Sequence, residues 1–238
     1  MDLTSYDAVL FDLDGVLTPT ADVHMAAWRA MFTAHFTAHG VTPAYSDADY
    51  FAYVDGKPRY DGVRSALASR GADLPEGDPG DAPGTETVCG LGNTKNAAFD
   101  RVLREDGVVA YPGSVALLDA LAARGTAVAV VSSSRNAPAV LAAAGLADRF
   151  TVVVDGTVAI AEGLPGKPAP DTFVFAAQQL GVPVERAVVV EDAVSGVAAG
   201  RAGGFGLVVG VDRGAGGDVL LEAGADVVVQ DLAELVVP

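Results

Sequence analysis

The sequence is poor in cysteine and in long apolar segments. Its one cysteine, Cys89, leaves no partner for a disulfide within the 238 residues, so we expect a reducing, cytoplasmic setting. No apolar run approaches the roughly 20 residues that span a membrane. The first residues lack the basic segment and long apolar stretch of a signal peptide. We therefore expect a protein with no membrane partner.

Positive charge is also scarce. Lys and Arg number 15 against 31 Asp and Glu, which gives a net charge of −16. Non-specific nucleic-acid binding needs a basic face, so we expect no nucleic-acid partner. The lysines are Lys57, Lys95 and Lys167, and in a chain that otherwise uses Arg they mark candidate sites for a compact ammonium group. An arginine-biased genome is the alternative explanation of the ratio.

The second half of the chain alternates between valine-rich apolar segments and helical patterns. This alternation predicts an α/β fold with a doubly wound parallel sheet, and strands that are apolar throughout indicate a sheet covered on both faces. We expect strands at 7–12, 127–131, 150–154, 187–190, 206–209 and 226–229, and helices at 114–124, 137–144, 171–180 and 195–202.

Only helical patterns lie between the first strand and Tyr111. The longest, 21–39, has its large apolar side chains at three- and four-residue steps and Thr20 as a candidate N-cap. Further helices are expected at 47–54, 58–70 and 93–105, and residues 71–84 predict a long irregular loop because they are rich in Gly, Pro and Asp. We interpret this region as an inserted α-helical cap domain, 20–107, within an α/β domain formed by 1–19 and 108–238. A hinged insert of this kind would form a lid.

The first strand ends in two carboxylates, Asp12 and Asp14, followed by Gly15. Strand residues two apart point to the same side, and ligands of open α/β sheets bind beyond the carboxyl ends of the strands. Two crowded carboxylates repel unless a cation offsets them, and Mg²⁺ is the simplest candidate. In the functional interpretation Asp12 is a nucleophile and Asp14 a general acid/base. The alternative is a turn-forming Asp-Leu-Asp-Gly.

Three further polar segments follow predicted strands. Ser132-Ser133-Ser134-Arg135-Asn136 opens a helix, where it could bind an anion or simply cap the helix. Lys167, before Pro168, could neutralise the nucleophile and a phosphate oxygen, or be an ordinary surface lysine. Glu191 and Asp192 suit Mg²⁺, or stabilise the start of the next helix. At one sheet edge these groups together indicate Mg²⁺-dependent phosphoryl transfer.

The order Asp-x-Asp-Gly, Ser, Lys, Glu-Asp resembles the haloacid dehalogenase superfamily over essentially the whole chain. The helical insert is similar to the cap of its β-phosphoglucomutase-like subgroup. The local matches are the segments 12–28, Gly56-Lys57-Pro58-Arg59, Lys95-Asn96, 132–136, 166–171 and 191–192.

This resemblance implies a role for each matched residue. Asp12 is the nucleophile and a Mg²⁺ ligand, Asp14 is the acid/base whose main-chain oxygen binds the metal, and Glu191 and Asp192 complete the metal site. Ser132 and Lys167 hold the transferred phosphate. The matched motifs place the remaining substrate-binding residues at Ser133, Arg135, Asn136, Arg59, Lys95 and His24. His24 would position Asp14 when the lid closes, or simply pack at the base of the cap.

Two reactions fit this pattern. A mutase of the β-phosphoglucomutase type converts β-glucose 1-phosphate to glucose 6-phosphate, whereas a sugar-phosphate phosphatase lets water take the phosphoryl group. The hinge sequence, His24 and the basic cap residues favour the mutase. Pro19, which stands where the subgroup commonly has Asp, and the extra loop at 71–88 weaken that choice. A receiver-type phospho-acceptor is disfavoured by the motif order. We expect a monomer that binds a small phosphorylated sugar.

Overall fold

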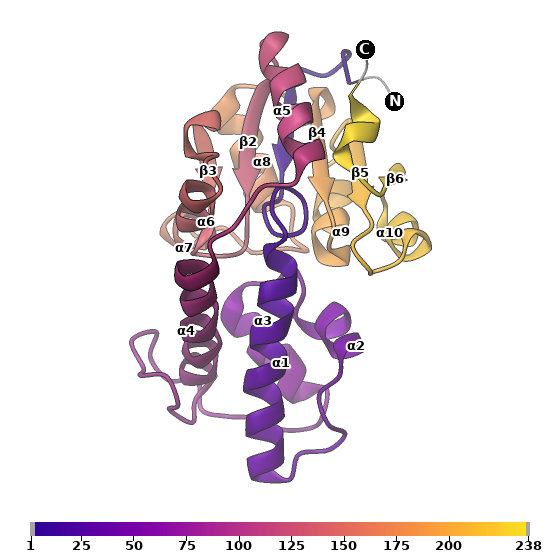
Figure 1. Cartoon of the computed structure of the whole chain (residues 1–238). Coiled ribbons are helices and arrows are strands. Elements are labelled where there is room, and N and C mark those ends of the chain that lie inside the picture. Colours follow the sequence, from indigo (N-terminus) through magenta and orange to yellow (C-terminus); the bar gives the residue numbers. More distant parts are fainter. Residues whose placement is uncertain (1–2, 237–238) are drawn as a thin grey trace. The chain divides into compact units, whose positions relative to one another are not determined.

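The computed structural model describes residues 3–236. The chain forms two compact units, one from residues 1–20 and 108–238 and the other from residues 21–107. The first is an α/β unit and the second is helical (Figure 1). Within residues 3–236, no helix is both long and apolar enough to cross a membrane.

The α/β unit is built on a six-stranded sheet in the order β3-β2-β1-β4-β5-β6. All five strand pairs are parallel, as the alternating pattern predicted. Phe11 is in register with both Val130 and Val190, so Asp12 is level with the ends of both neighbouring strands. The strands are β1 (Ala8–Phe11), β2 (Ala127–Val131), β3 (Val152–Val154), β4 (Ala187–Glu191), β5 (Leu207–Val211) and β6 (Val227–Val229).

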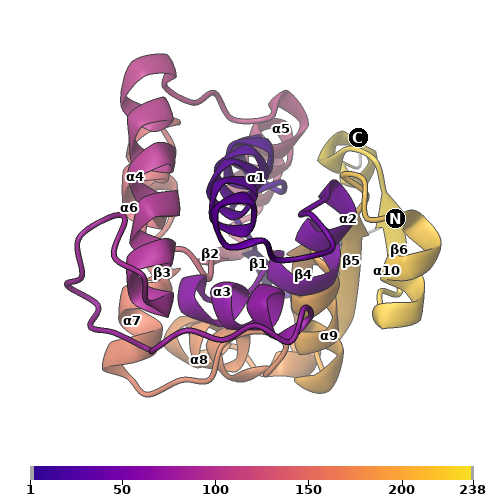
Figure 2. The same cartoon turned by 90° about the horizontal axis from the view of Figure 1, so that it is seen from below.

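Helices cover both faces of this sheet. Figure 2 shows α8 and α9 on one side and α5 on the other, and the apolar residues of α8 and α9 form one buried cluster with those of the central strands. The unit's helices are α5 (Pro112–Ala123), α6 (Ala137–Ala143), α7 (Gly156–Ala161), α8 (Asp171–Leu180), α9 (Val194–Ala202) and α10 (Gly217–Ala223). The sequence pattern missed the short helices α7 and α10, which have six and seven residues.

The helical unit has its own apolar core. Trp28, Phe32 and Phe36 are buried in it, as their spacing predicted. The ring of Phe32 packs against the ring of Trp28 and against that of Phe36. Its elements are α1 (Thr20–His39), α2 (Asp47–Asp49), the π-helical turn η1 (Tyr50–Val54), α3 (Arg59–Ala68) and α4 (Val88–Asp106). Helix α4 begins before the predicted residue 93, and Thr87 caps it by accepting a hydrogen bond from Gly90 N.

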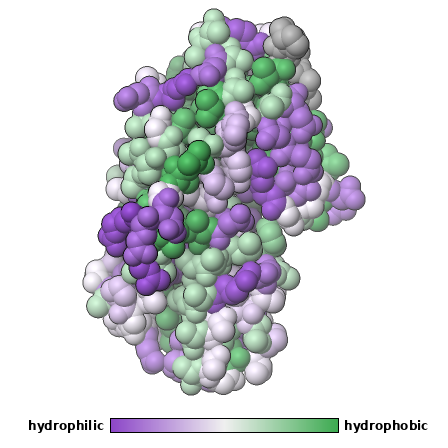
Figure 3. Space-filling view, viewed as in Figure 1, coloured by the Kyte–Doolittle hydropathy of each residue, from purple (hydrophilic) through white to green (hydrophobic). Residues whose placement is uncertain are grey.

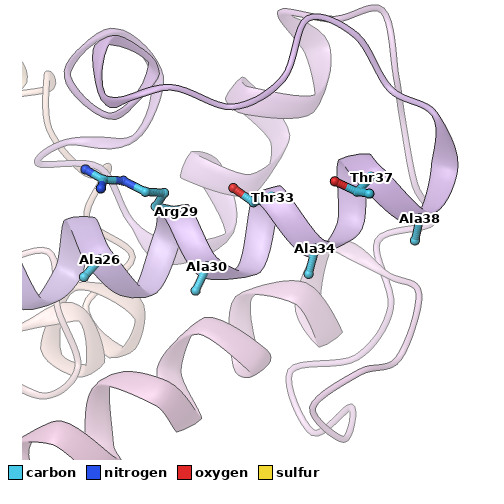
Figure 4. Close-up of a pocket in the computed structure, with 7 residues that line it drawn as sticks. All are labelled: Ala26, Arg29, Ala30, Thr33, Ala34, Thr37 and Ala38. Carbon is cyan, nitrogen blue, oxygen red and sulfur yellow. The ribbon is translucent and has the colours of Figure 1, made fainter.

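One face of α1 carries mainly alanine and threonine. These residues, with Arg29, line a shallow hollow of about 670 Å³ (Figure 4). Over the face of the molecule seen in Figure 3, hydrophilic and hydrophobic residues are interspersed. The exposed large hydrophobic side chains of the described residues are Val109, Ile160, Val219 and Leu221.

The core of the helical unit gives a direct stability test. Leu67 is almost fully buried among its aromatic residues, so Leu67→Ala should lower the free energy of unfolding by about 2–5 kcal/mol. Urea titration followed by the fluorescence of Trp28, the single tryptophan, measures it. Leu221→Ala makes the same change at an exposed position and should cost about 0.5 kcal/mol or less. Equal losses in the two variants would contradict this assignment of the core.

Candidate functional site

The chain leaves β1 in a compact loop formed by residues 12–18. Asp12 N donates to Val190 O at 2.9 Å, which continues the sheet by one residue, and Gly15 N donates to Thr18 O at 2.7 Å, which closes the loop. Gly15 has a φ of +88°, a conformation that glycine adopts readily and other residues rarely do. An added Cβ there would lie 1.8 Å from Asp192 Oδ2. The glycine therefore brings the Asp192 carboxylate directly against the loop that carries Asp12 and Asp14.

Lys167 lies at the centre of the charged groups. Its ammonium donates to Asp12 Oδ1 at 2.6 Å, to Glu191 Oε1 at 2.5 Å and to Val131 O at 3.1 Å. Lys167 is 3% exposed and Glu191 is fully buried, which excludes the surface-lysine alternative. Burial of an isolated charge is costly, so the buried ammonium of Lys167 and the carboxylates of Asp12 and Glu191 depend on one another for charge neutralisation.

The buried charges shift one another's proton affinities. Burial lowers the pKa of Lys167, but the carboxylates of Asp12 and Glu191 outweigh it, so the net shift is upward and the ammonium stays charged. Burial raises the pKa of Asp12 well above its usual range, helped by Glu191 and Asp14 and opposed by Lys167. Further positive charge near Asp12 would stabilise its ionised form.

Asp14 has a different environment from Asp12. The Thr20 hydroxyl donates to its Oδ1, and the Ser132 hydroxyl lies 3.5 Å from its Oδ2. Thr20 is the first residue of α1 and shares a hydrogen bond with Thr18 (2.7 Å). Its hydroxyl thus orients Asp14 in addition to standing at the start of the helix. One carboxylate is paired with an ammonium and the other with hydroxyls, so the two acids are chemically distinct.

The serine-rich segment after β2 folds back on its own backbone. Ser132 Oγ accepts from Ser134 N at 3.1 Å, and Ser134 Oγ accepts from Asn136 N at 3.1 Å. These bonds form tight turns before α6, whose N-cap residue, Asn136, makes no side-chain capping hydrogen bond, while Ser132 also reaches Asp14. Ser133 and Arg135 pack closely on Gly156, where an added Cβ would be 2.8 Å from Ser133 O and 3.1 Å from Arg135 Cγ.

The two acids after β4 differ in their partners. Glu191 is committed on both oxygens, because Oε1 accepts from Lys167 and Oε2 accepts from Ala193 N at 2.8 Å. This second bond lies at the start of α9 and agrees with the helix-stabilising interpretation. Asp192 instead faces Gly15. Among residues 3–236, no three His, Cys, Asp or Glu side chains are grouped closely enough to hold a metal by themselves.

Arg213 is a neighbour of this site that the sequence analysis missed. Its Nε donates to Gly15 O at 2.8 Å, its Nη1 donates to Gln230 O at 2.9 Å, and its guanidinium lies 4.1 Å over the ring of Tyr111. Tyr111 N in turn donates to Leu17 O at 3.0 Å. Arg213 thus braces the 12–18 loop. The available signal was its position just after β5, at the carboxyl edge that also carries the other site residues.

In the helical unit, Arg59 begins α3 and donates to two side chains of α4. Its Nη1 lies 3.2 Å from Asn93 Oδ1 and its Nη2 lies 2.7 Å from Asn96 Oδ1. Lys57, from the same predicted motif, donates to Ser65 Oγ at 3.0 Å, and burial lowers its pKa. Arg59 and Lys57 are therefore held by different groups, although they are two residues apart.

Lys95 and His24 are buried together in the helical unit. The Lys95 ammonium is hydrogen-bonded to His24 Nδ1 and lies 5.0 Å and 5.3 Å from the rings of Trp28 and Phe99. The imidazole is stacked on Phe99 at 4.0 Å. Aromatic faces attract a cation, so the two rings help to hold the ammonium within the unit.

Comparison with known proteins supports the resemblance carried by the motifs. A family model described as haloacid dehalogenase-like hydrolase matches residues 6–204. Beta-phosphoglucomutase of Mycobacterium tuberculosis is 52% identical, over 96% of this chain and 90% of that protein. The crystal structure of beta-phosphoglucomutase from Clostridium difficile has a TM-score of 0.76 and 25% identity, and covers 97% of this chain and 93% of its own. A haloacid dehalogenase family hydrolase from Deinococcus radiodurans, with bound phosphate and sodium, is 32% identical with a TM-score of 0.64, over 97% and 93% of the two chains.

The charge arrangement around Lys167 can be tested by stability. Lys167→Met leaves two buried carboxylates without their cation, so it should destabilise the protein by about 3–5 kcal/mol. Adding Glu191→Gln should recover part of the loss. Lys57→Met removes a half-buried lysine that donates to a hydroxyl and should cost about 1 kcal/mol or less. Urea unfolding followed by circular dichroism compares the variants, and a Lys167→Met protein as stable as wild type would refute the assignment.

Proposed function

This chain belongs to the haloacid dehalogenase-like hydrolase family of enzymes, and we propose that it is a Mg²⁺-dependent phosphomutase that converts β-glucose 1-phosphate to glucose 6-phosphate. The M. tuberculosis relative, named a beta-phosphoglucomutase, supports this substrate. The observation that carries the proposal is the buried contact of Lys167 with Asp12 and Glu191. It gives one carboxylate of the pair in the 12–18 loop a fixed orientation and a local positive charge.

Asp12 is the proposed nucleophile. Lys167 orients its carboxylate, which attacks phosphorus and forms the aspartyl-phosphate. The bond between phosphorus and the sugar oxygen breaks in that step. Lys167 and Ser132 bind the oxygens of the transferred group, where charge is concentrated during the transfer. Ser133, Arg135 and Asn136 border this phosphate site.

Asp14 is the proposed general acid and base. It gives a proton to the sugar oxygen that leaves phosphorus, and it takes a proton from the hydroxyl that later attacks the aspartyl-phosphate. The hydroxyl of Thr20 and the nearby Ser132 orient its carboxylate. In a mutase the accepting hydroxyl belongs to the sugar, so the phosphoryl group passes through a sugar bisphosphate.

The residues around Gly15 suit a hard divalent cation. Asp12 has a second oxygen beyond the one that Lys167 holds, the Asp14 carbonyl precedes Gly15, and the Asp192 carboxylate lies against that glycine. Mg²⁺ commonly takes one or two carboxylates and completes its shell with water and phosphate oxygens. We therefore assign Asp12, the Asp14 carbonyl and Asp192 to it, with Glu191 acting mainly through Lys167. When bound, the ion neutralises negative charge on the reacting groups.

We assign residues 21–107 to the cap and the remaining residues to the catalytic domain. Arg59 and Lys95 are the proposed ligands of the second phosphate of the sugar bisphosphate, and His24 fixes the Lys95 ammonium. Cap closure would exclude water, which separates phosphoryl return to a sugar from hydrolysis.

One assay distinguishes the mutase from a phosphatase. Protein with Mg²⁺ receives β-glucose 1-phosphate and a trace of glucose 1,6-bisphosphate, and both glucose 6-phosphate and free phosphate are measured. We expect glucose 6-phosphate without net phosphate release. Release of phosphate from several sugar phosphates would replace the mutase proposal with a phosphatase.

Substitution of the two acids tests their separate roles in the same assay. Asp12→Asn should lower kcat by about four orders of magnitude or more because it removes the nucleophile. Asp14→Asn should lower kcat by about two to four orders of magnitude because it removes proton transfer. Asp22→Asn makes the same change at an exposed residue of α1 and should leave kcat near wild type. Full activity of Asp12→Asn would contradict the proposed mechanism.

A further inference from the structure

Asn93 joins Arg59 to the loop that precedes α4. Its Oδ1 accepts from Arg59 at 3.2 Å and from the Tyr60 hydroxyl at 3.1 Å. Its Nδ2 donates to Pro79 O at 3.1 Å and to Asp81 O at 2.9 Å. An asparagine amide has two donor hydrogens and two acceptor lone pairs, so these four bonds use its whole capacity. The side chain is therefore fixed from both sides.

The loop in question, residues 75–87, is fastened to α4 at several points. Asp81 Oδ2 accepts from the Thr87 hydroxyl at 2.6 Å, and Thr87 caps the helix. Gly84 N donates to Thr94 Oγ1 at 2.7 Å, and Val88 N donates to Pro75 O at 2.9 Å. The Gly, Pro and Asp composition predicted an irregular loop, and it is irregular, but its backbone carbonyls at 79 and 81 are held by the amide of Asn93.

The helix pair around Arg59 is closely packed. An added Cβ at Gly92 would lie 2.8 Å from Tyr60 Cδ1 and 3.1 Å from Arg59 Cγ, so the glycine allows α3 and α4 to approach here. Asn96, the second partner of Arg59, donates to Asp100 Oδ2 at 2.9 Å. Both Asn93 and Asn96 offer amide oxygens to the guanidinium. An amide oxygen orients an arginine without the full negative charge that a carboxylate would place beside it.

From these contacts we propose that Asn93 is a positioning residue, and that the 75–87 loop is a specificity element that acts through it. The loop fixes Asn93, and Asn93 fixes Arg59 toward the second phosphate of a sugar bisphosphate. This inference rests on the proposed function. The ligand class is a sugar carrying a second phosphate monoester, which a fixed planar guanidinium can bind through two parallel hydrogen bonds.

The inference predicts a selective kinetic defect. Asn93→Ala should raise KM for β-glucose 1-phosphate by about tenfold or more, since a hydrogen bond to a charged group is lost, with kcat changed less. Asn93→Ala should hydrolyse acetyl phosphate at the wild-type rate. Acetyl phosphate has no second phosphate, but its reaction still requires Asp12. Asn93→Asp should also raise KM because it adds negative charge beside Arg59 and removes the two donors to the loop.

The matched control is Gln178→Ala. It removes an amide side chain at an exposed position of α8, outside the helical unit, so KM should stay near wild type. Thermal unfolding of each variant shows whether it is folded. Titration of glucose 6-phosphate into each protein gives affinity independently of turnover, and Asn93→Ala should bind about tenfold or more weakly, the change in KM being mirrored in Kd.

The outcomes separate this inference from the proposed function. An active wild type with unchanged KM and affinity in Asn93→Ala overturns the inference and leaves the proposed function intact. An equal loss with acetyl phosphate and with the sugar phosphate also overturns it, because the role of Asn93 would then be general stability. A wild type that neither converts nor binds a sugar phosphate overturns both.

Discussion

The α/β unit depends on one buried ammonium. Lys167 offsets Asp12 and Glu191 at the point where β1 and β4 end side by side, and the register of a parallel sheet is what brings these acids level. Without the cation, two carboxylates would be buried together, which is costly. The same contact orients the carboxylate of Asp12, so the stability of the unit and the proposed nucleophile both depend on Lys167.

A second level of structure makes the two acids of the 12–18 loop different. Asp12 is held by an ammonium, whereas Asp14 is held by hydroxyls from Thr20 and Ser132. Gly15 lets Asp192 approach, and Arg213 braces the carbonyl of the same glycine. A carboxylate with a fixed charge partner suits nucleophilic attack, and one with hydroxyl partners suits proton exchange. The two basic residues of the helical unit also have different partners. Neutral amides orient Arg59, whereas aromatic faces and an imidazole hold Lys95.

The parallel sheet was predictable because apolar strands that alternate with helices form a parallel sheet. The helical insert was predictable because only helical patterns lie between the first strand and Tyr111. The polar residues at strand ends followed from that topology. The partner of Glu191 was not predictable, since an acid pair fits a metal or a lysine equally well until burial and register are known. Arg213 and Asn93 were missed because their roles come from hydrogen bonds to backbone carbonyls. Arg213 binds the carbonyl of Gly15, which is distant in sequence, and Asn93 binds that of Pro79. Composition revealed that 71–84 is irregular, but long-range hydrogen bonds decide where such a loop lies.

The central claim is that Asp12 carries the phosphoryl group, and chemical trapping tests it most directly. Protein mixed with Mg²⁺ and β-glucose 1-phosphate during turnover is treated with borohydride, which reduces an aspartyl-phosphate to homoserine, and the modified peptide is identified by mass spectrometry. We expect homoserine at position 12 and an unmodified aspartate at position 14. Modification at another residue, or turnover with no trapped residue at all, would contradict the central claim.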